Sequence, residues 1–143
     1  MCIYRATLFI LLAVLVGCGN KDSSTIAEQF VASGHKSIDL ASAVSTDWDR
    51  VCILGPYTTD ASASQALGFK WSAEALTSIE ENDGISLLVF VQNNKVFSYV
   101  EHSRSYGDFS NLAGLCFPRN KAKFLQSARP VKGWPGLFPA NAS

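Results

Sequence analysis

The chain has 143 residues, with 12 basic and 12 acidic side chains and a formal net charge of zero. Nucleic-acid binding normally requires a basic stripe or a pI well above neutral, whereas the sequence pI is about 6.7. The composition therefore excludes nucleic acid as the expected partner, and the length suits one domain with a substantial core.

The first residues have the layout of a secretory signal peptide: Arg5 precedes an apolar run over 6–16. The run ends in Leu15-Val16-Gly17-Cys18, which resembles a bacterial lipobox. The resemblance implies that the Cys18 thiol is diacylated, that the chain is cut before Cys18 and that the new amine is acylated. Two acyl chains already give stable membrane anchoring, so we expect a lipoprotein whose mature part begins at Cys18.

Two other interpretations of this segment are weaker. A transmembrane helix needs about 20 apolar residues, which is more than the run contains. The small residues Ala13 and Gly17 do not form the A-x-A-like site of an ordinary secretory signal. In Gram-negative lipoproteins, Asp after the lipidated cysteine would favour the inner membrane. Because Gly19 stands there, the resemblance implies the periplasmic face of the outer membrane.

Two cysteines remain for the folded domain, since Cys2 would leave with the signal peptide. In an exported compartment, Cys52 and Cys116 are expected to form a disulfide. The bridge would close a loop of about 65 residues and contribute roughly 4 kcal/mol by the chain-entropy argument. Two free thiols are an alternative. A metal site with His35 and His102 is another, although metal-ligand spacing is absent.

The N-terminal part of the mature chain predicts a tether and a helix. Residues 18–24 are polar and indicate a short flexible tether. Thr25 and Glu28 match a capping box, which predicts a helix over 26–33 closed by Gly34.

The next segments predict strands and two short helices. A weak alternation covers 37–44, and the apolar run 51–54 indicates a strand covered on both faces. Asp60 is expected to cap a helix that ends at Leu67 before Gly68. A second helix is expected from Ser72 to about Glu81.

The strongest local pattern is a hairpin. Strand-like runs at 86–92 and 95–102 flank Asn93-Asn94, which tolerate the positive φ of a two-residue turn. An uninterrupted register places Gln92 opposite Lys95, Val91 opposite Val96, Val89 opposite Ser98, Leu87 opposite Val100, Phe90 opposite Phe97 and Leu88 opposite Tyr99. Because both faces carry large apolar groups, the first of these strands should be central in its sheet.

The C-terminal part is less regular. Asp108 is expected to cap a short helix through Ala113, and 122–127 predicts a strand or a helix. Residues 129–139 hold three prolines and two glycines, which argues against regular structure. The tail carries Trp134, Leu137 and Phe138, so it either lies across the domain, which we favour, or presents an apolar contact to a partner.

These elements together predict an α+β fold with an antiparallel sheet of four or five strands and helices mainly on one face. The expected organisation is a signal peptide at 1–17, a tether at 18–24, a domain at 25–128 and a tail at 129–143.

Several short segments carry a family resemblance. They are Trp48-Asp49-Arg50-Val51, Pro56-Tyr57, Gly68-Phe69-Lys70-Trp71, Leu88-Val89-Phe90-Val91 and Asp108-Phe109. Together they resemble a group of small, uncharacterised lipoproteins of Gram-negative bacteria, over about residues 48–124. Cys52 stands where that pattern has an aromatic or aliphatic residue. The resemblance implies location and fold and supplies no mechanism.

The candidate partner-binding residues are Trp48, Arg50, Tyr57 and Trp134. A Trp beside an Arg is typical of binding hot spots, and on a strand Trp48 and Arg50 share one face. The alternative is structural: the indole packs on the core while Arg50 pairs with a carboxylate such as Asp108. No catalytic, metal or cofactor motif is present, and Glu80-Glu81 indicates a solvated helix end.

We therefore expect a membrane-anchored periplasmic lipoprotein with a non-catalytic role in binding or envelope maintenance. Its acyl chains would insert in the membrane, and its partner would be a protein of the envelope. An immunity or inhibitor protein against a periplasmic toxin or a lysozyme-type enzyme is the second hypothesis, and an envelope hydrolase is the third.

Overall fold

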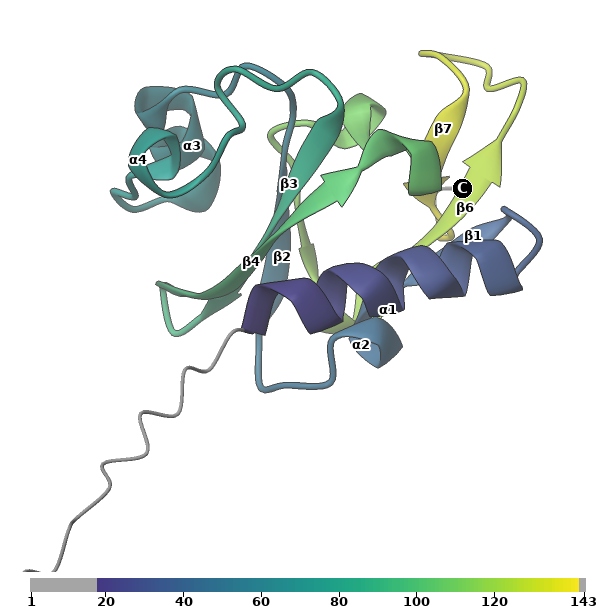
Figure 1. Cartoon of the computed structure of the whole chain (residues 1–143), viewed down its shortest axis with the longest axis horizontal. Helices are drawn as coiled ribbons and strands as arrows, with labels where there is room; N and C mark the ends of the chain where they lie inside the picture. Colours follow the sequence, from purple (N-terminus) through teal and green to yellow (C-terminus); the bar gives the residue numbers. More distant parts are fainter. Residues whose placement is uncertain (1–17, 142–143) are drawn as a thin grey trace, which may run out of the picture.

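The structure is a computed structural model that describes residues 18–141. Two antiparallel sheets and four α-helices form one α+β unit, as predicted (Figure 1). In chain order the elements are α1 (Cys18–Ala32), β1 (Ser37–Asp39), α2 (Leu40–Ala43), β2 (Arg50–Leu54), α3 (Asp60–Leu67), α4 (Ala73–Leu76), β3 (Ile85–Gln92), β4 (Lys95–Ser103), the 3-10 turns η1 (Arg104–Tyr106) and η2 (Ser110–Leu112), β5 (Cys116–Pro118), the 3-10 turn η3 (Arg119–Lys121), β6 (Lys123–Ser127) and β7 (Gly136–Pro139).

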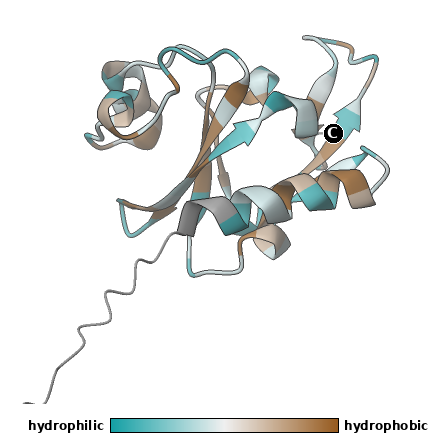
Figure 2. Ribbon diagram, viewed as in Figure 1, coloured by the Kyte–Doolittle hydropathy of each residue, from teal (hydrophilic) through white to brown (hydrophobic). Residues whose placement is uncertain are grey.

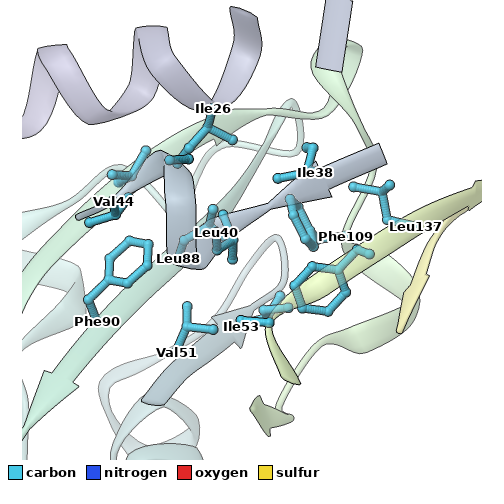
Figure 3. Packing of buried hydrophobic residues seen from close by; sticks show 14 of the residues in the cluster. Ile26, Ile38, Leu40, Val44, Val51, Ile53, Leu88, Phe90, Phe109 and Leu137 are labelled. Atoms are coloured by element: carbon cyan, nitrogen blue, oxygen red, sulfur yellow. The ribbon is translucent and has the colours of Figure 1, made fainter. Parts of the chain in front are cut away.

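The larger sheet has four strands in the order β4-β3-β2-β5, and β3 is central, as the hairpin pattern predicted. One of its faces packs on α1, α2 and the smaller sheet β1-β6-β7, through Val51, Ile53, Leu88 and Phe90 (Figure 3). The opposite face packs on α3 and α4. Apolar residues accordingly predominate in β2 and β3, whereas polar and apolar residues alternate along α1 (Figure 2).

The disulfide prediction is confirmed. Cys52 on β2 and Cys116 on β5 are directly opposite each other and are bonded, with sulfurs 2.02 Å apart. The alternatives of free thiols or a metal site therefore do not apply to these two cysteines. The bridge fixes the short strand β5 to the edge of the larger sheet.

The predictions of a flexible tether at 18–24 and of a capping box at Thr25 are both wrong. Helix α1 begins at Cys18, and Thr25 lies inside it, where its hydroxyl donates to the carbonyl of Lys21 at 2.9 Å. Ile26 and Phe30 are buried and dock the helix on the domain. Because tertiary packing supplies most helical stability, these contacts extend the helix through polar residues that by themselves indicate a linker. The predicted signal peptide, residues 1–17, lies outside the described residues.

The hairpin forms with the expected turn but a different register. Gln92 faces Lys95 and Val91 faces Val96, after which a β-bulge shifts the pairing. Beyond it, Phe90 faces Ser98, Val89 faces Tyr99, Leu88 faces Val100 and Leu87 faces Glu101, so the four uninterrupted pairs predicted there are wrong. The bulge leaves Phe97 as the extra residue and turns Val100 into the core beside Leu88.

The short elements before the hairpin differ from the predicted ones mainly in length. The strand predicted at 37–44 stops at Asp39, whose carboxylate accepts the N–H of Ala41 and starts α2. Helix α3 ends at Leu67 as predicted, although Thr59 caps it. Helix α4 covers only Ala73–Leu76, so the helix expected to about Glu81 is too long.

The tail contains regular structure, contrary to the prediction. Residues 123–127 form β6, and β7 pairs with it antiparallel. Proline is tolerated here because β7 is an edge strand, with Pro139 at its end. Leu137 is fully buried, which confirms that the tail lies across the domain.

Candidate binding surface

Trp48 belongs to the core rather than to a binding surface. Its side chain is 2% exposed, and its indole Nε1 donates to the carbonyl of Val44 at 2.7 Å. Its ring meets Phe90 edge to face, and the guanidinium of Arg119 lies 5.0 Å from the ring centroid. The structural interpretation of this tryptophan therefore holds, and direct contact with a partner is excluded by burial.

Arg50 joins three elements. Its guanidinium donates to the carbonyl of Leu67, the last residue of α3, at 2.9 Å and to Asn94 Oδ1 of the hairpin turn at 3.4 Å. Cations near the last carbonyls of a helix are stabilising, so Arg50 fixes α3 to the sheet. The suggested pairing with Asp108 is wrong, because Arg104 forms that ion pair.

Tyr57 and Trp134 are the two predicted residues that reach the surface, and each is 62% exposed. Tyr57 has φ of 64°, which is uncommon for a residue with a large side chain. Its N–H donates to the carbonyl of Ile79 at 2.8 Å. This backbone hydrogen bond helps to hold Tyr57 in its left-handed conformation at the end of β2.

Trp134 is held by its backbone while its ring stays in solvent. The side-chain NH2 of Asn111 donates to the carbonyl of Trp134 at 2.8 Å. The backbone N–H of Trp134 in turn donates to Asn111 Oδ1 at 3.2 Å. Gly133 has φ of 87°, and a Cβ there would overlap Asn111. A Cβ on Gly136 would lie 2.8 Å from the carbonyl oxygen of Asp108. The two glycines therefore permit the close approach on which this arrangement depends.

An ion pair lies between the two aromatic residues. Arg104 donates to Asp108 at 2.8 Å and to the carbonyl of Asp83 at 2.8 Å. The hydrogen bond from Arg104 to Asp108 raises the pKa of the guanidinium, and Tyr57 is near enough to contribute in the same direction. The carbonyl of Asp108 accepts the N–H of Leu137 at 2.8 Å, which ties the ion pair to the tail.

The pKa of Asp108 reflects two opposing effects. Partial burial alone would raise it, but hydrogen bonds from Arg104 and Ser110 together outweigh burial and hold the pKa below its usual value. Asp108 is therefore ionised at neutral pH and can keep both Arg104 and the start of η2 in place. The predicted helix from Asp108 through Ala113 is wrong: only the 3-10 turn η2 forms, and its N-cap is Phe109. Asp108 Oδ1 nevertheless accepts the N–H of Ser110 at 2.8 Å, at the first residue of that turn.

We call Tyr57, Arg104, Asp108, Asn111 and Trp134 the aromatic rim. In Figure 1, the loop after β2 and the loop before β7 lie along one edge of the molecule, whereas α1 begins on the opposite edge. Arg104 and Asn111 were missed as functional candidates. Their importance depends on contacts with residues more than 20 positions away, for which the local sequence carries no signal.

His102 supports the rim from below. It is 1% exposed, and its Nε2 lies 3.1 Å from the carbonyl oxygens of both Tyr106 and Gly107, so we assign the ring proton to Nε2. Burial lowers the pKa of His102 in spite of these hydrogen bonds. The ring orders the turn that leads to Asp108. His35, in contrast, is exposed.

A separate groove of about 710 Å³ runs between α1 and the β4–η1 segment. Ala27, Val31, Ile85 and Tyr106 supply much of its lining, and Glu28 lies at its side. His102 also borders the groove, but its Nε2 is engaged with backbone carbonyls. Within residues 18–141, no group of three or more His, Cys, Asp or Glu side chains is arranged to hold a metal ion.

In comparisons with known proteins, no protein-family model, no curated protein and no solved structure matches the chain. The function is therefore inferred from the geometry described above. Over the described range, none of the helices has the length and apolarity needed to cross a bilayer.

Proposed function

We propose that this protein is a lipid-anchored, non-catalytic binding protein of the cell envelope that recognises a protein partner through the aromatic rim. The main support for the proposal is the geometry at Trp134. Asn111 forms hydrogen bonds with both the carbonyl and the N–H of Trp134, while the residue is 62% exposed. A fold that fixes an exposed tryptophan in this way gains little stability from the ring itself. The arrangement is well suited to recognition.

The physical argument concerns the entropy of binding. Association normally costs free energy because loops and side chains become ordered, and a loop held in place before binding avoids part of that cost. Tryptophan, tyrosine and arginine are also the residues most enriched at binding hot spots. The rim brings Trp134, Tyr57 and Arg104 to one edge of the molecule.

The anchor is supported by the lipobox and by the orientation of the domain. Leu15-Val16-Gly17-Cys18 has the residues that lipidation requires, and α1 begins at Cys18. Since the rim lies on the edge opposite the start of α1, acylation of Cys18 would present the rim away from the bilayer (Figure 1). We place the anchored protein on the periplasmic face of the outer membrane.

An immunity or inhibitor role is the second candidate. The observation that favours it is again the loop before β7, which is fixed by Asn111 in the free protein. Enzyme–inhibitor complexes typically use surfaces that move little on binding. Loss of the partner's enzymatic activity in the complex would distinguish this role from envelope maintenance.

The anchor is tested by labelling cells with a clickable fatty acid. The wild-type chain is expected to take up label, and Cys18→Ser is expected to take up none. Cys2→Ser, in the segment that would be removed, is the matched control and should label like the wild type. Label retained by Cys18→Ser would contradict the anchor.

The rim is tested by cross-linking in envelope preparations. The wild type is expected to yield one cross-linked partner that Trp134→Ala and Tyr57→Ala fail to capture. Phe97→Ala is the matched control, because Phe97 is also an exposed aromatic residue, 46% exposed, but lies at the β3–β4 bulge. Equal capture by the wild type and Trp134→Ala, or a loss confined to Phe97→Ala, would refute recognition through the rim.

A further inference from the structure

A hollow of about 390 Å³ lies beside the start of α3, and none of its lining residues belongs to the rim or to the groove along α1. The first two turns of α3 form one wall. Residues 70–72 form the other, after Gly68 ends the helix with φ of 82°. In Figure 1, α3 and α4 lie together on the side of the larger sheet away from α1. The lining residues are Asp60, Ala61, Ser64, Lys70, Trp71 and Ser72. Small-molecule sites typically measure about 300–1,000 Å³, so the hollow has the size of such a site.

The two walls are fixed to each other by hydrogen bonds. The backbone N–H of Trp71 donates to Ser64 Oγ at 3.1 Å. The N–H of Glu74 donates to Asp60 Oδ1 at 2.8 Å, and the N–H of Asp60 donates to Glu74 Oε1 at 3.2 Å. The ring of Trp71 also packs against Tyr99, with centroids 5.5 Å apart. A ligand would therefore find the hollow already formed, which lowers the entropic cost of binding.

Several polar groups that border the hollow have no partner within residues 18–141. The Lys70 ammonium and the Ser72 hydroxyl make no hydrogen bond or ion pair there, and the indole N–H of Trp71 is open to solvent. The Ser64 hydroxyl accepts one hydrogen bond without donating its own proton, and Asp60 Oδ2 is unengaged over the same range. Donors and a carboxylate acceptor are thus available around one hollow.

The mixture of charges favours a ligand without net charge. Asp60 would repel an anion, and Lys70 would repel a cation. Both can instead bind hydroxyl groups, since a carboxylate accepts and an ammonium donates, and such charge-assisted hydrogen bonds are stronger than neutral ones. Trp71 adds an apolar surface and one further donor. A pyranose ring, with C–H groups on its faces and hydroxyls around its edge, matches this combination.

We propose that this hollow, which we call the α3 hollow, binds one pyranose ring of a neutral saccharide. A face of the sugar packs on Trp71, while Asp60 accepts a hydrogen bond from its hydroxyls and Lys70 donates one to them. The β form of glucose is the best match, because all its ring substituents are equatorial and both faces carry only C–H groups. The site shares no residue with the aromatic rim, so it does not depend on the protein partner of the rim.

The three tryptophans of the chain provide the readout, because each indole N–H gives its own signal in a ¹⁵N-correlated NMR spectrum. The purified full chain is titrated with cellotriose, the β-1,4-linked trimer of glucose, in a detergent that has no sugar head group. We expect a saturable shift of the Trp71 signal with a Kd of about 1 mM or below, while Trp48 and Trp134 stay unchanged. No saturable shift of Trp71 at concentrations well above that value, or a shift confined to Trp134, would overturn the proposal.

Two conservative variants test the polar contacts. Asp60→Asn removes the charge but retains the oxygen that accepts the N–H of Glu74, and Lys70→Met removes the ammonium but retains an unbranched side chain. Each is expected to bind cellotriose at least about tenfold more weakly, since hydrogen bonds to charged groups are the stronger ones. Asp47→Asn and Lys95→Met, at exposed positions outside the hollow, are the matched controls and should bind like the wild type. Wild-type affinity in both hollow variants, or equal losses in the controls, would refute the site.

The other occupant that the charges would suit is a zwitterion, such as the two ends of a short peptide. Alanylalanine should therefore leave the Trp71 signal unchanged at the concentrations where cellotriose saturates it. A shift with alanylalanine and none with cellotriose would assign the α3 hollow to peptide ends and make the saccharide site wrong. Trp134→Ala should bind cellotriose like the wild type, so this site and the rim can fail independently.

Discussion

Trp48 and Trp134 are both tryptophans that the sequence marks as candidate binding residues, yet the structure uses them in opposite ways. At Trp48 the ring is buried and hydrogen-bonded, so the side chain itself stabilises the fold. At Trp134 the backbone is hydrogen-bonded and the ring is exposed, so the fold positions the side chain without using it. The comparison shows that the residue type alone does not identify a binding residue. What matters is which part of the residue the fold requires.

The largest expected effect is on stability, at the buried member of the pair. Trp48→Ala removes a core indole packed against Phe90 and should lower the free energy of unfolding by about 3–5 kcal/mol. Urea denaturation followed by circular dichroism measures this loss. Partner capture per folded molecule should be unchanged, and a stable variant that no longer captured its partner would reverse the roles assigned to the two tryptophans.

Asn111→Ala should have an intermediate effect, because it removes both hydrogen bonds to the backbone of Trp134. We expect a loss of about 1–3 kcal/mol in the free energy of unfolding, together with weaker partner capture. Amide hydrogen exchange should show faster exchange at Trp134 than in the wild type. Unchanged exchange would mean that Asn111 does not hold the loop. Asn120→Ala, at an exposed position of η3, is the matched control.

The stability of the rim around Trp134 should depend more on pH than that of the core around Trp48, because His102 packs behind the turn that leads to Asp108. The pKa of His102 in the folded chain is below that of the unfolded chain, about 6.5, so the unfolded state binds the extra proton first. Stability is therefore complete above about pH 6.5 and falls as the pH drops towards the folded pKa, by up to about 1.4 kcal/mol per pH unit. Denaturation curves between pH 5 and 8 would measure the slope, which His102→Gln should remove.

At lower pH the ion pair is lost as well. The pKa of Asp108 is held below its unfolded value of about 3.9, so its contribution to stability is present above that pH and disappears as the pH falls through the folded pKa. Asp108→Asn should remove this second, acidic step. A stability that stayed level from pH 8 to 5 in the wild type would contradict the burial of a neutral His102.

The sequence predicted elements whose signals are local. The Asn93-Asn94 turn, the end of α3 at Gly68 and the Cys52–Cys116 pair each depend on adjacent residues or on elimination among few cysteines. Long-range packing decided the rest. The bulge at Phe97 places Val100 in the core, and α1 reaches back to Cys18 because Ile26 and Phe30 dock it. For the same reason, one of the four candidate binding residues, Trp48, is buried, Arg50 is half-buried, and Tyr57 and Trp134 are exposed.

Trp134→Ala should have the smallest effect on stability, within about 0.5 kcal/mol, because the ring is mostly in solvent and Asn111 contacts only the backbone. Thermal or urea denaturation measures this, with Phe97→Ala as the comparison. A loss of several kcal/mol would mean that the indole is part of the fold after all.

The most direct test of recognition through the rim is the affinity of the cross-linked partner, once purified, for three proteins: the wild type, Trp134→Ala and Phe97→Ala. Isothermal titration calorimetry on folded samples separates affinity from stability. We predict that Trp134→Ala binds at least about 30-fold more weakly, a hot-spot loss of about 2 kcal/mol, while Phe97→Ala binds like the wild type. Wild-type affinity in Trp134→Ala would contradict the account.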